Sequence, residues 1–140
     1  MNMPESPNCP CASALPYEMC CARYHAGALP EDAAVLMRSR YSAFAKHLAD
    51  YIIKTTHPEK AKRNPSLVKW KQELLQFSRD TQFVGLRILD FVDGEKAATV
   101  TFTAYLMQHG RDVSFTEKST FAKVGKRWLY KSGDLRKVLP

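Results

Sequence analysis

The sequence predicts an α+β protein, with helices in the first half of the chain and an antiparallel sheet in the second. Between residues 30 and 80, apolar residues recur every three to four positions, which is typical of amphipathic helices. After residue 80 they recur at every second position, which is typical of strands. Helices followed by a run of strands indicate the α+β class. A cysteine-rich segment, residues 1–28, precedes this domain, residues 29–140.

The first helix is expected to start at residues 30–32, Pro-Glu-Asp, because proline suits a first turn and acidic residues complement the helix dipole. We expect it to kink near Asp50 and to end before Pro58, because the residue before a proline avoids helical dihedrals. A second helix is expected over residues 66–78. The apolar stripes of the two helices contain Met37, Tyr41, Phe44 and Leu48, then Leu67, Trp70, Leu74 and Phe77.

Four strands are expected, over residues 82–92, 96–107, 112–124 and 126–132. The dipeptides at 93–94 (Asp-Gly) and 109–110 (His-Gly) and the single Gly125 predict the turns between them. In the second strand Val100, Phe102, Ala104 and Leu106 share one face. We therefore expect a meander whose apolar face is covered by the helices.

The composition suits a protein with a core and excludes wholesale disorder. Of the 140 residues, 45% are hydrophobic and 11% aromatic. No stretch approaches the roughly 20 apolar residues needed to cross a bilayer. The N-terminus has neither the basic nor the apolar region of a signal peptide. We therefore expect a cytoplasmic protein without membrane contact.

The net charge of +7 is unevenly distributed, with −3 over residues 1–35 and +10 over the rest. Basic residues concentrate in segments 54–71 and 118–137, which also contain Trp70 and Tyr130. Such a pattern favours acidic partners, including RNA or the ribosome. We favour the simpler interpretation of solvated lysines, because periodicity assigns both aromatic residues to the core and no nucleic-acid-binding signature is present.

The four cysteines follow the pattern C-x-C-x8-C-C, at Cys9, Cys11, Cys20 and Cys21. Two closely spaced pairs joined by a turn supply the tetrahedral thiolate set of a structural zinc site. The adjacent pair reaches one metal only if the backbone bends there, as at a helix start. Four protein ligands leave no open position, so such a site is not catalytic. The alternatives are ordinary cysteines, a redox pair, or two disulfides in an exported protein.

The segment CPCASALPYEMCC resembles the SEC-C motif, a zinc-binding element named for the C-terminus of the SecA translocation ATPase. Four further segments resemble YchJ-like SEC-C proteins: LMRSRYSAFAKHLADYIIKTTHP (36–58), FVGL (83–86), FTEKSTF (115–121) and WLYKSGD (128–134). The resemblance implies zinc at all four cysteines. It also implies a nuclear transport factor 2-like domain, a cone of helices over a bent sheet with a pocket between them.

The chain departs from the SEC-C pattern in its knuckle, the name used here for residues 1–28. That pattern has glycine after the second cysteine, where this chain has Ala12, and lysines before the tyrosine, where it has Ala14, Leu15 and Pro16. In SecA the motif docks on the acidic chaperone SecB. A knuckle without these lysines is poorly suited to an acidic partner, although a protein partner of other chemistry is still expected.

A candidate pocket is predicted around Glu117, which shares one strand face with Ser119 and several apolar residues. A buried carboxylate needs a partner. Arg38 and Arg40 lie about 200° apart on the first helix, so only one of them can reach Glu117, and His57 can join at the helix exit. These five residues are the candidate site. The arginine–glutamate pair is either structural or part of a ligand-binding or acid–base site.

We favour a zinc-binding interaction or ligand-binding module over an enzyme, because the sequence contains no nucleophile–base pair, phosphate loop or second metal cluster. The alternatives are an acid–base enzyme using Glu117, His57 and an arginine, or an RNA- or ribosome-associated factor. An open pocket around Glu117 would favour a ligand or catalysis, and a closed ion pair would favour a scaffold. His25, His47 and His109 are expected on the surface.

Overall fold

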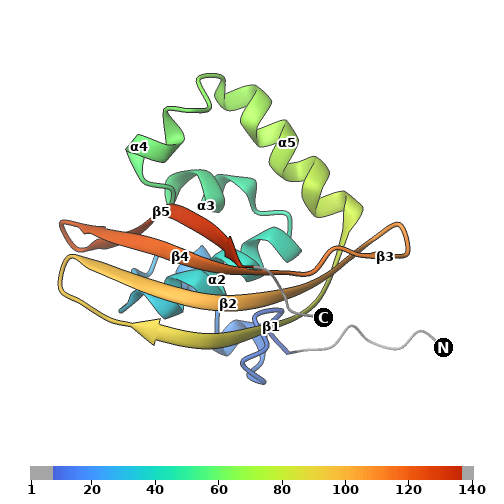
Figure 1. Cartoon of the computed structure of the whole chain (residues 1–140), viewed down its shortest axis with the longest axis horizontal. Coiled ribbons are helices and arrows are strands. Elements are labelled where there is room, and N and C mark those ends of the chain that lie inside the picture. Colours follow the sequence, from blue (N-terminus) through green and yellow to red (C-terminus); the bar gives the residue numbers. More distant parts are fainter. Residues whose placement is uncertain (1–7, 137–140) are drawn as a thin grey trace.

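The helices lie to one side of a curved antiparallel sheet in the computed structural model, which describes residues 8–136 (Figure 1). The outermost parts of both predicted segments, residues 1–7 and 137–140, fall outside this range. The knuckle contains a short 3-10 helix, η1 (Tyr17–Met19), and the one-turn helix α1 (Ala22–His25). In Figure 1, α5 runs along the helical side of the sheet and leads directly into β1.

Two helices occupy the region where one was predicted. Helix α2 (Ala33–Ala45) begins as expected, with the Asp32 side chain accepting a hydrogen bond from the Val35 amide at 2.8 Å. The predicted continuation is wrong, because His47 adopts a left-handed conformation (φ 62°) that ends the helix before the expected kink. The chain re-enters a helix as α3 (Ala49–Lys54).

The other helices start at residues that cap them. His57 caps the short helix α4 (Pro58–Ala61), in which Pro58 occupies the first turn. Ser66 caps α5 (Leu67–Asp80) by accepting from the Lys69 amide at 3.2 Å, which confirms the second predicted helix. None of the described helices is long and apolar enough to cross a membrane.

The sheet has the predicted meander order, with strands arranged β1-β2-β4-β5, all antiparallel, and a short β3 paired with β2. The strands are β1 (Thr81–Val92), β2 (Ala97–Gln108), β3 (Arg111–Asp112), β4 (Phe115–Val124) and β5 (Arg127–Arg136). The predicted third strand is divided, and the fourth runs four residues beyond its predicted end at 132 because it continues to pair with β4. Register shifts in β1 and β5 mark bulges, which bend strands.

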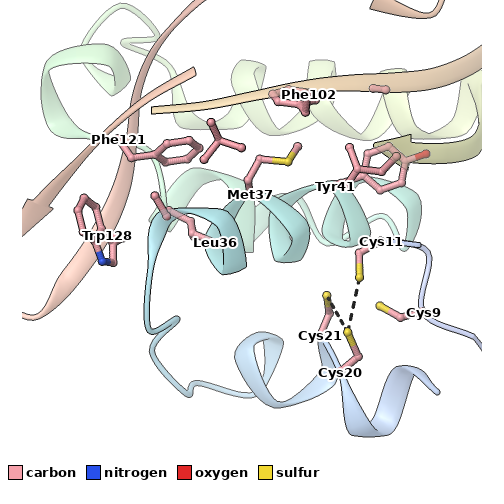
Figure 2. Close-up of a cluster of buried hydrophobic side chains, with 14 of the residues drawn as sticks. Cys9, Cys11, Cys20, Cys21, Leu36, Met37, Tyr41, Phe102, Phe121 and Trp128 are labelled. Atoms are coloured by element: carbon pink, nitrogen blue, oxygen red, sulfur yellow. Dashed lines mark hydrogen bonds between the residues drawn. The ribbon is translucent and has the colours of Figure 1, made fainter. Parts of the chain in front are cut away.

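The core lies between α2 and the inner face of the sheet. The four residues of β2 predicted to share a face are all buried. They pack with Leu36, Met37 and Tyr41 from α2 and with Phe121 from β4. Figure 2 shows this cluster on one side of α2 and the four cysteines on the other. One helix therefore separates the two features predicted to carry function.

Candidate functional site

The four cysteines converge into one buried cluster. Their sulfur atoms all lie within 4.8 Å of one another. The Sγ atoms of Cys11 and Cys20 are 3.5 Å apart, and those of Cys20 and Cys21 are 3.9 Å apart. A disulfide requires about 2.05 Å, and all four thiols are free.

The backbone reaches this arrangement through two unusual stretches. Between the cysteine pairs, Ala12 and Ala14 both have a left-handed φ of 66°, a conformation that normally favours glycine. The bend predicted between the adjacent cysteines is present, because Cys20 closes η1 and Cys21 caps the start of α1. This change of direction turns two neighbouring side chains toward the same point.

The cluster fits a tetrahedral metal ion. Four sulfurs at about 2.3 Å from a zinc ion would lie about 3.8 Å from one another, close to the separations found here. Hydrogen bonding with Cys11 and Cys9, together with burial, raises the pKa of Cys21. Hydrogen bonds from Cys11 and Cys21 lower the pKa of Cys9. Four thiolates so close together therefore need a cation to stay ionised.

Hydrogen bonds attach the knuckle to α2. The Arg38 guanidinium Nη1 donates to the Cys11 carbonyl oxygen at 2.7 Å, and the Ser42 hydroxyl lies 3.4 Å from the Cys9 sulfur. Arg38 was predicted as a pocket residue, and that placement is wrong because its side chain points to the knuckle side of the helix. Only Arg40 faces the other way, as the 200° separation requires.

His25 strengthens the same attachment. Its Nε2 lies 2.8 Å from the Ser39 carbonyl oxygen and its Nδ1 lies 2.7 Å from the Tyr17 hydroxyl. A carbonyl only accepts, so Nε2 carries the proton and Nδ1 accepts from tyrosine. Burial lowers the pKa of His25, which keeps the ring neutral. The expectation that His25 is a surface residue is wrong, whereas His47 and His109 are exposed as predicted.

A cavity of about 300 Å³ occupies the opposite side of α2, between the helices and the sheet. Three of the five predicted pocket residues line it, namely Arg40, Glu117 and Ser119. Its apolar wall is mainly aromatic and includes Tyr41, Phe44, Trp70, Phe77, Phe83, Phe102, Phe115 and Phe121. Lys60 and Tyr130, which lie in the two basic segments, also line it and were not predicted as site residues. The period-two spacing of the fourth predicted strand, which assigns Tyr130 to the core side, could have indicated this residue.

Glu117 does not form the predicted ion pair with either arginine among the described residues. Its Oε2 accepts from the Ser119 hydroxyl at 2.5 Å and from the Tyr130 hydroxyl at 3.3 Å. The carboxylate occupies the space beside Gly133, where any Cβ atom would collide with it. The partners of Glu117 thus come from its own strand and the neighbouring one, which explains why no arginine is required.

Arg40 is a buried cation held by neutral groups. Its Nη1 donates to the Thr55 hydroxyl at 2.7 Å, to the Ile52 carbonyl at 3.1 Å and to the Thr56 hydroxyl at 3.3 Å. Its guanidinium carbon lies 4.6 Å from the centre of the Tyr130 ring. Burial lowers the pKa of Arg40 to about 10, while the tyrosines and Glu117 nearby oppose this shift.

His57 is not among the residues that line the cavity. Its Nδ1 accepts from the Glu59 amide at 3.1 Å, and its backbone amide donates to the Tyr130 carbonyl at 2.7 Å. The side chain therefore serves as a helix cap. The predicted placement of His57 at the pocket is wrong, because the start of α4 turns its ring toward that helix.

The fold and the site define a class of protein, a nuclear transport factor 2-like domain with a four-cysteine knuckle packed on its first long helix. The model of the YchJ middle NTF2-like domain family matches residues 32–133. A UPF0225 protein of Bordetella pertussis is 42% identical over 138 residues, covering 95% of this chain and 97% of its own. A UPF0225 protein of Streptomyces coelicolor is 36% identical, covering 92% and 96%.

Two solved structures share the fold. The solution structure of RPA3114, a SEC-C motif containing protein from Rhodopseudomonas palustris, superposes with a TM-score of 0.81 at 30% identity, covering 93% of this chain and 99% of that one. The crystal structure of a SEC-C motif containing protein from Psychrobacter arcticus gives 0.76 at 26% identity, covering 95% and 85%. The chain belongs to the YchJ-like family of SEC-C motif proteins.

Proposed function

We propose that this protein is a ligand-binding module in which the knuckle holds one structural zinc ion and the cavity behind α2 receives a small molecule. The observation that carries the proposal is the open cavity around Glu117, which replaces the closed ion pair that a scaffold would have. Its volume lies at the lower end of the range of small-molecule sites, and its wall combines many apolar groups with a few polar ones, as such sites do.

Zinc is the ion that this cluster suits best. Tetrahedral thiolate sets hold zinc or iron–sulfur clusters, and all four cysteines are used, so no position is left for a water molecule. The role of the metal is then to fold the knuckle, which is too short to form a core of its own. Two hydrogen bonds then hold the folded knuckle against α2. Arg38 of α2 donates to the Cys11 carbonyl oxygen, and His25 of the knuckle donates to the Ser39 carbonyl oxygen.

Binding is favoured over acid–base catalysis because the predicted catalytic set is not assembled. That set required His57, which caps α4 instead of lining the cavity. The carboxylate of Glu117 already accepts two hydrogen bonds from its neighbours. A protein partner at the knuckle is still a prediction, and the exposed side chains of Leu15 and Met19 are the apolar surface that it would meet.

Native mass spectrometry combined with elemental analysis of freshly purified, reduced protein tests the proposal. We expect about one zinc per chain and an added mass from a retained small molecule that is lost on mild denaturation. If the analysis instead found iron and the protein absorbed visible light, the cluster would be assigned as an iron–sulfur site and not as a zinc site. Failure to detect any ligand, together with failure of every probe described below to bind, would contradict the binding function.

A further inference from the structure

We infer that the cavity selects a small apolar monocarboxylate, with the carboxylate against Arg40 and Lys60 and the apolar body among the aromatic side chains. This inference rests on the binding function proposed above and specifies the chemical class of the ligand. It is carried by the charge and the hydrogen-bonding capacity at one end of the cavity, and by the size and composition of the rest.

Arg40 retains unused hydrogen-bonding capacity that faces the cavity. In the part of the chain that the structure describes, only its Nη1 makes hydrogen bonds, and all three acceptors are neutral oxygens. Within residues 8–136, neither Nε nor Nη2 has a hydrogen-bond partner. No fully buried side-chain nitrogen or oxygen lacks a partner in the described part of the chain, so these two atoms must reach open space. Arg40 is only 8% exposed and lines the cavity, which makes the cavity that space.

The polar end of the cavity carries a surplus positive charge. Among the described residues, the charged ones that line the cavity are Arg40, Lys60 and Glu117, which leaves one positive charge uncompensated within that part of the chain. Tyr130 lies among all three, with Arg40 and Lys60 over its ring at 4.6 and 5.5 Å and its hydroxyl donating to Glu117. Both hydroxyl donors reach the same oxygen of Glu117, Oε2, so the unused hydrogen-bond donors at this end of the cavity belong to the two cations. A planar carboxylate matches a guanidinium that presents two adjacent nitrogens.

The remainder of the cavity sets the size and nature of the ligand body. A volume of about 300 Å³ corresponds to roughly ten water volumes, and therefore to about ten non-hydrogen atoms. Edge-to-face ring pairs such as Phe44–Phe77, Phe77–Phe83 and Phe102–Phe115 form its walls. Aromatic rings favour such edge and offset contacts, so an aryl group on a short chain is a well-matched occupant.

Three matched probes test the charge preference: 3-phenylpropionate, its neutral amide, and 3-phenylpropylamine. They have nearly the same size and differ mainly in the charge of the polar end. Titration calorimetry and the fluorescence of Trp70, which lines the cavity, would report binding. We expect the carboxylate to bind at least about tenfold more tightly than the amide, because its hydrogen bonds to Arg40 are charge-assisted. The amine should bind more weakly still.

Variants show where the probe binds. Arg40 itself is not replaced, because its removal would also take away the hydrogen-bond donor of the Thr55 and Thr56 hydroxyls. Ala104→Leu adds bulk at a buried cavity position and should abolish binding of the carboxylate. Lys60→Gln removes one of the two cations and should weaken carboxylate binding about three- to tenfold without affecting the amide. Lys62→Gln is the matched control, because Lys62 is an exposed neighbour that does not line the cavity; it should leave binding unchanged.

The outcomes separate the ligand class from the binding function. If the amide or the amine binds within the cavity as tightly as the carboxylate, the carboxylate assignment is overturned and the binding function stands. If the carboxylate binds but Ala104→Leu has no effect, it binds elsewhere on the surface and the assignment is also overturned. If no probe binds at millimolar concentration and no ligand is retained on purification, both the assignment and the binding function fail.

Discussion

Replacing Ala12 by glycine should strengthen metal binding by the knuckle. Ala12 has a left-handed φ of 66°, which costs an L-residue roughly 1–2 kcal/mol. Its side chain is exposed, so removing the Cβ atom sacrifices no packing. Glycine makes the unfolded chain more flexible, which offsets about 0.4–1 kcal/mol of the gain. The net stabilisation is then about 1 kcal/mol, and at 1.4 kcal/mol per decade it corresponds to about a fivefold tighter metal dissociation constant.

Competition with a chelator measures this change, because metal binding and folding of such a segment are coupled. Ala14→Gly should behave like Ala12→Gly, since Ala14 has the same φ. Ala28→Gly is the control, because Ala28 is an exposed alanine of the same segment whose φ is not left-handed. A gain of similar size in the control, or no gain in Ala12→Gly, would refute the backbone-strain argument.

Three further changes have definite expected outcomes. Arg38→Ala removes the charged hydrogen bond to the Cys11 carbonyl and should lower the free energy of unfolding by about 1.5–3 kcal/mol in denaturant titrations; the exposed Arg63→Ala should change it by less than about 0.5 kcal/mol. Burial raises the pKa of Tyr41 to about 12. The contribution of Tyr41 to the free energy of unfolding is therefore fully present below pH 10, where the side chain of the unfolded protein starts to ionise. It is lost between pH 10 and 12. That loss amounts to about 2 kcal/mol by pH 12, and Tyr41→Phe should flatten this part of the stability profile; an unchanged alkaline slope would contradict the assignment. Removing the metal should increase amide hydrogen exchange in the knuckle and α2 while leaving β2 protected, and equal deprotection of both would argue against local coupling.

The order of helices and strands was predictable because most elements bury one face and therefore keep a regular period. The break at His47 was not, since neither glycine nor proline marks it and only the three-dimensional structure places a histidine at positive φ. The division of the predicted third strand into β3 and β4 was not predictable for a similar reason, because no residue in the sequence marks it. There the Ser114 hydroxyl contacts the backbone of Leu106, a local hydrogen bond that periodicity does not report.

The candidate site was predicted in part for the same reason. Strand alternation correctly put Glu117 and Ser119 on the inner face, and helix geometry correctly required Arg38 and Arg40 to point apart. Helix geometry alone could not say which of the two arginines faces the cavity. The partner of Glu117 was predicted wrongly because charge complementarity suggested an arginine, whereas the nearest donors are the hydroxyls of Ser119 and Tyr130. Short-range donors on the sheet satisfy a carboxylate without requiring a distant cation.

The position of α2 links the proposed metal site to the proposed ligand cavity. The helix presents Arg38 and Ser42, four residues apart, to the cysteines. It presents Met37 and Tyr41, also four residues apart, to the cavity. Residues with this spacing form separate stripes on one rigid helix, so a shift of α2 on losing its knuckle contacts must move the cavity wall as well. Under the proposal above, a metal without a free coordination position would therefore still set the geometry in which the ligand binds.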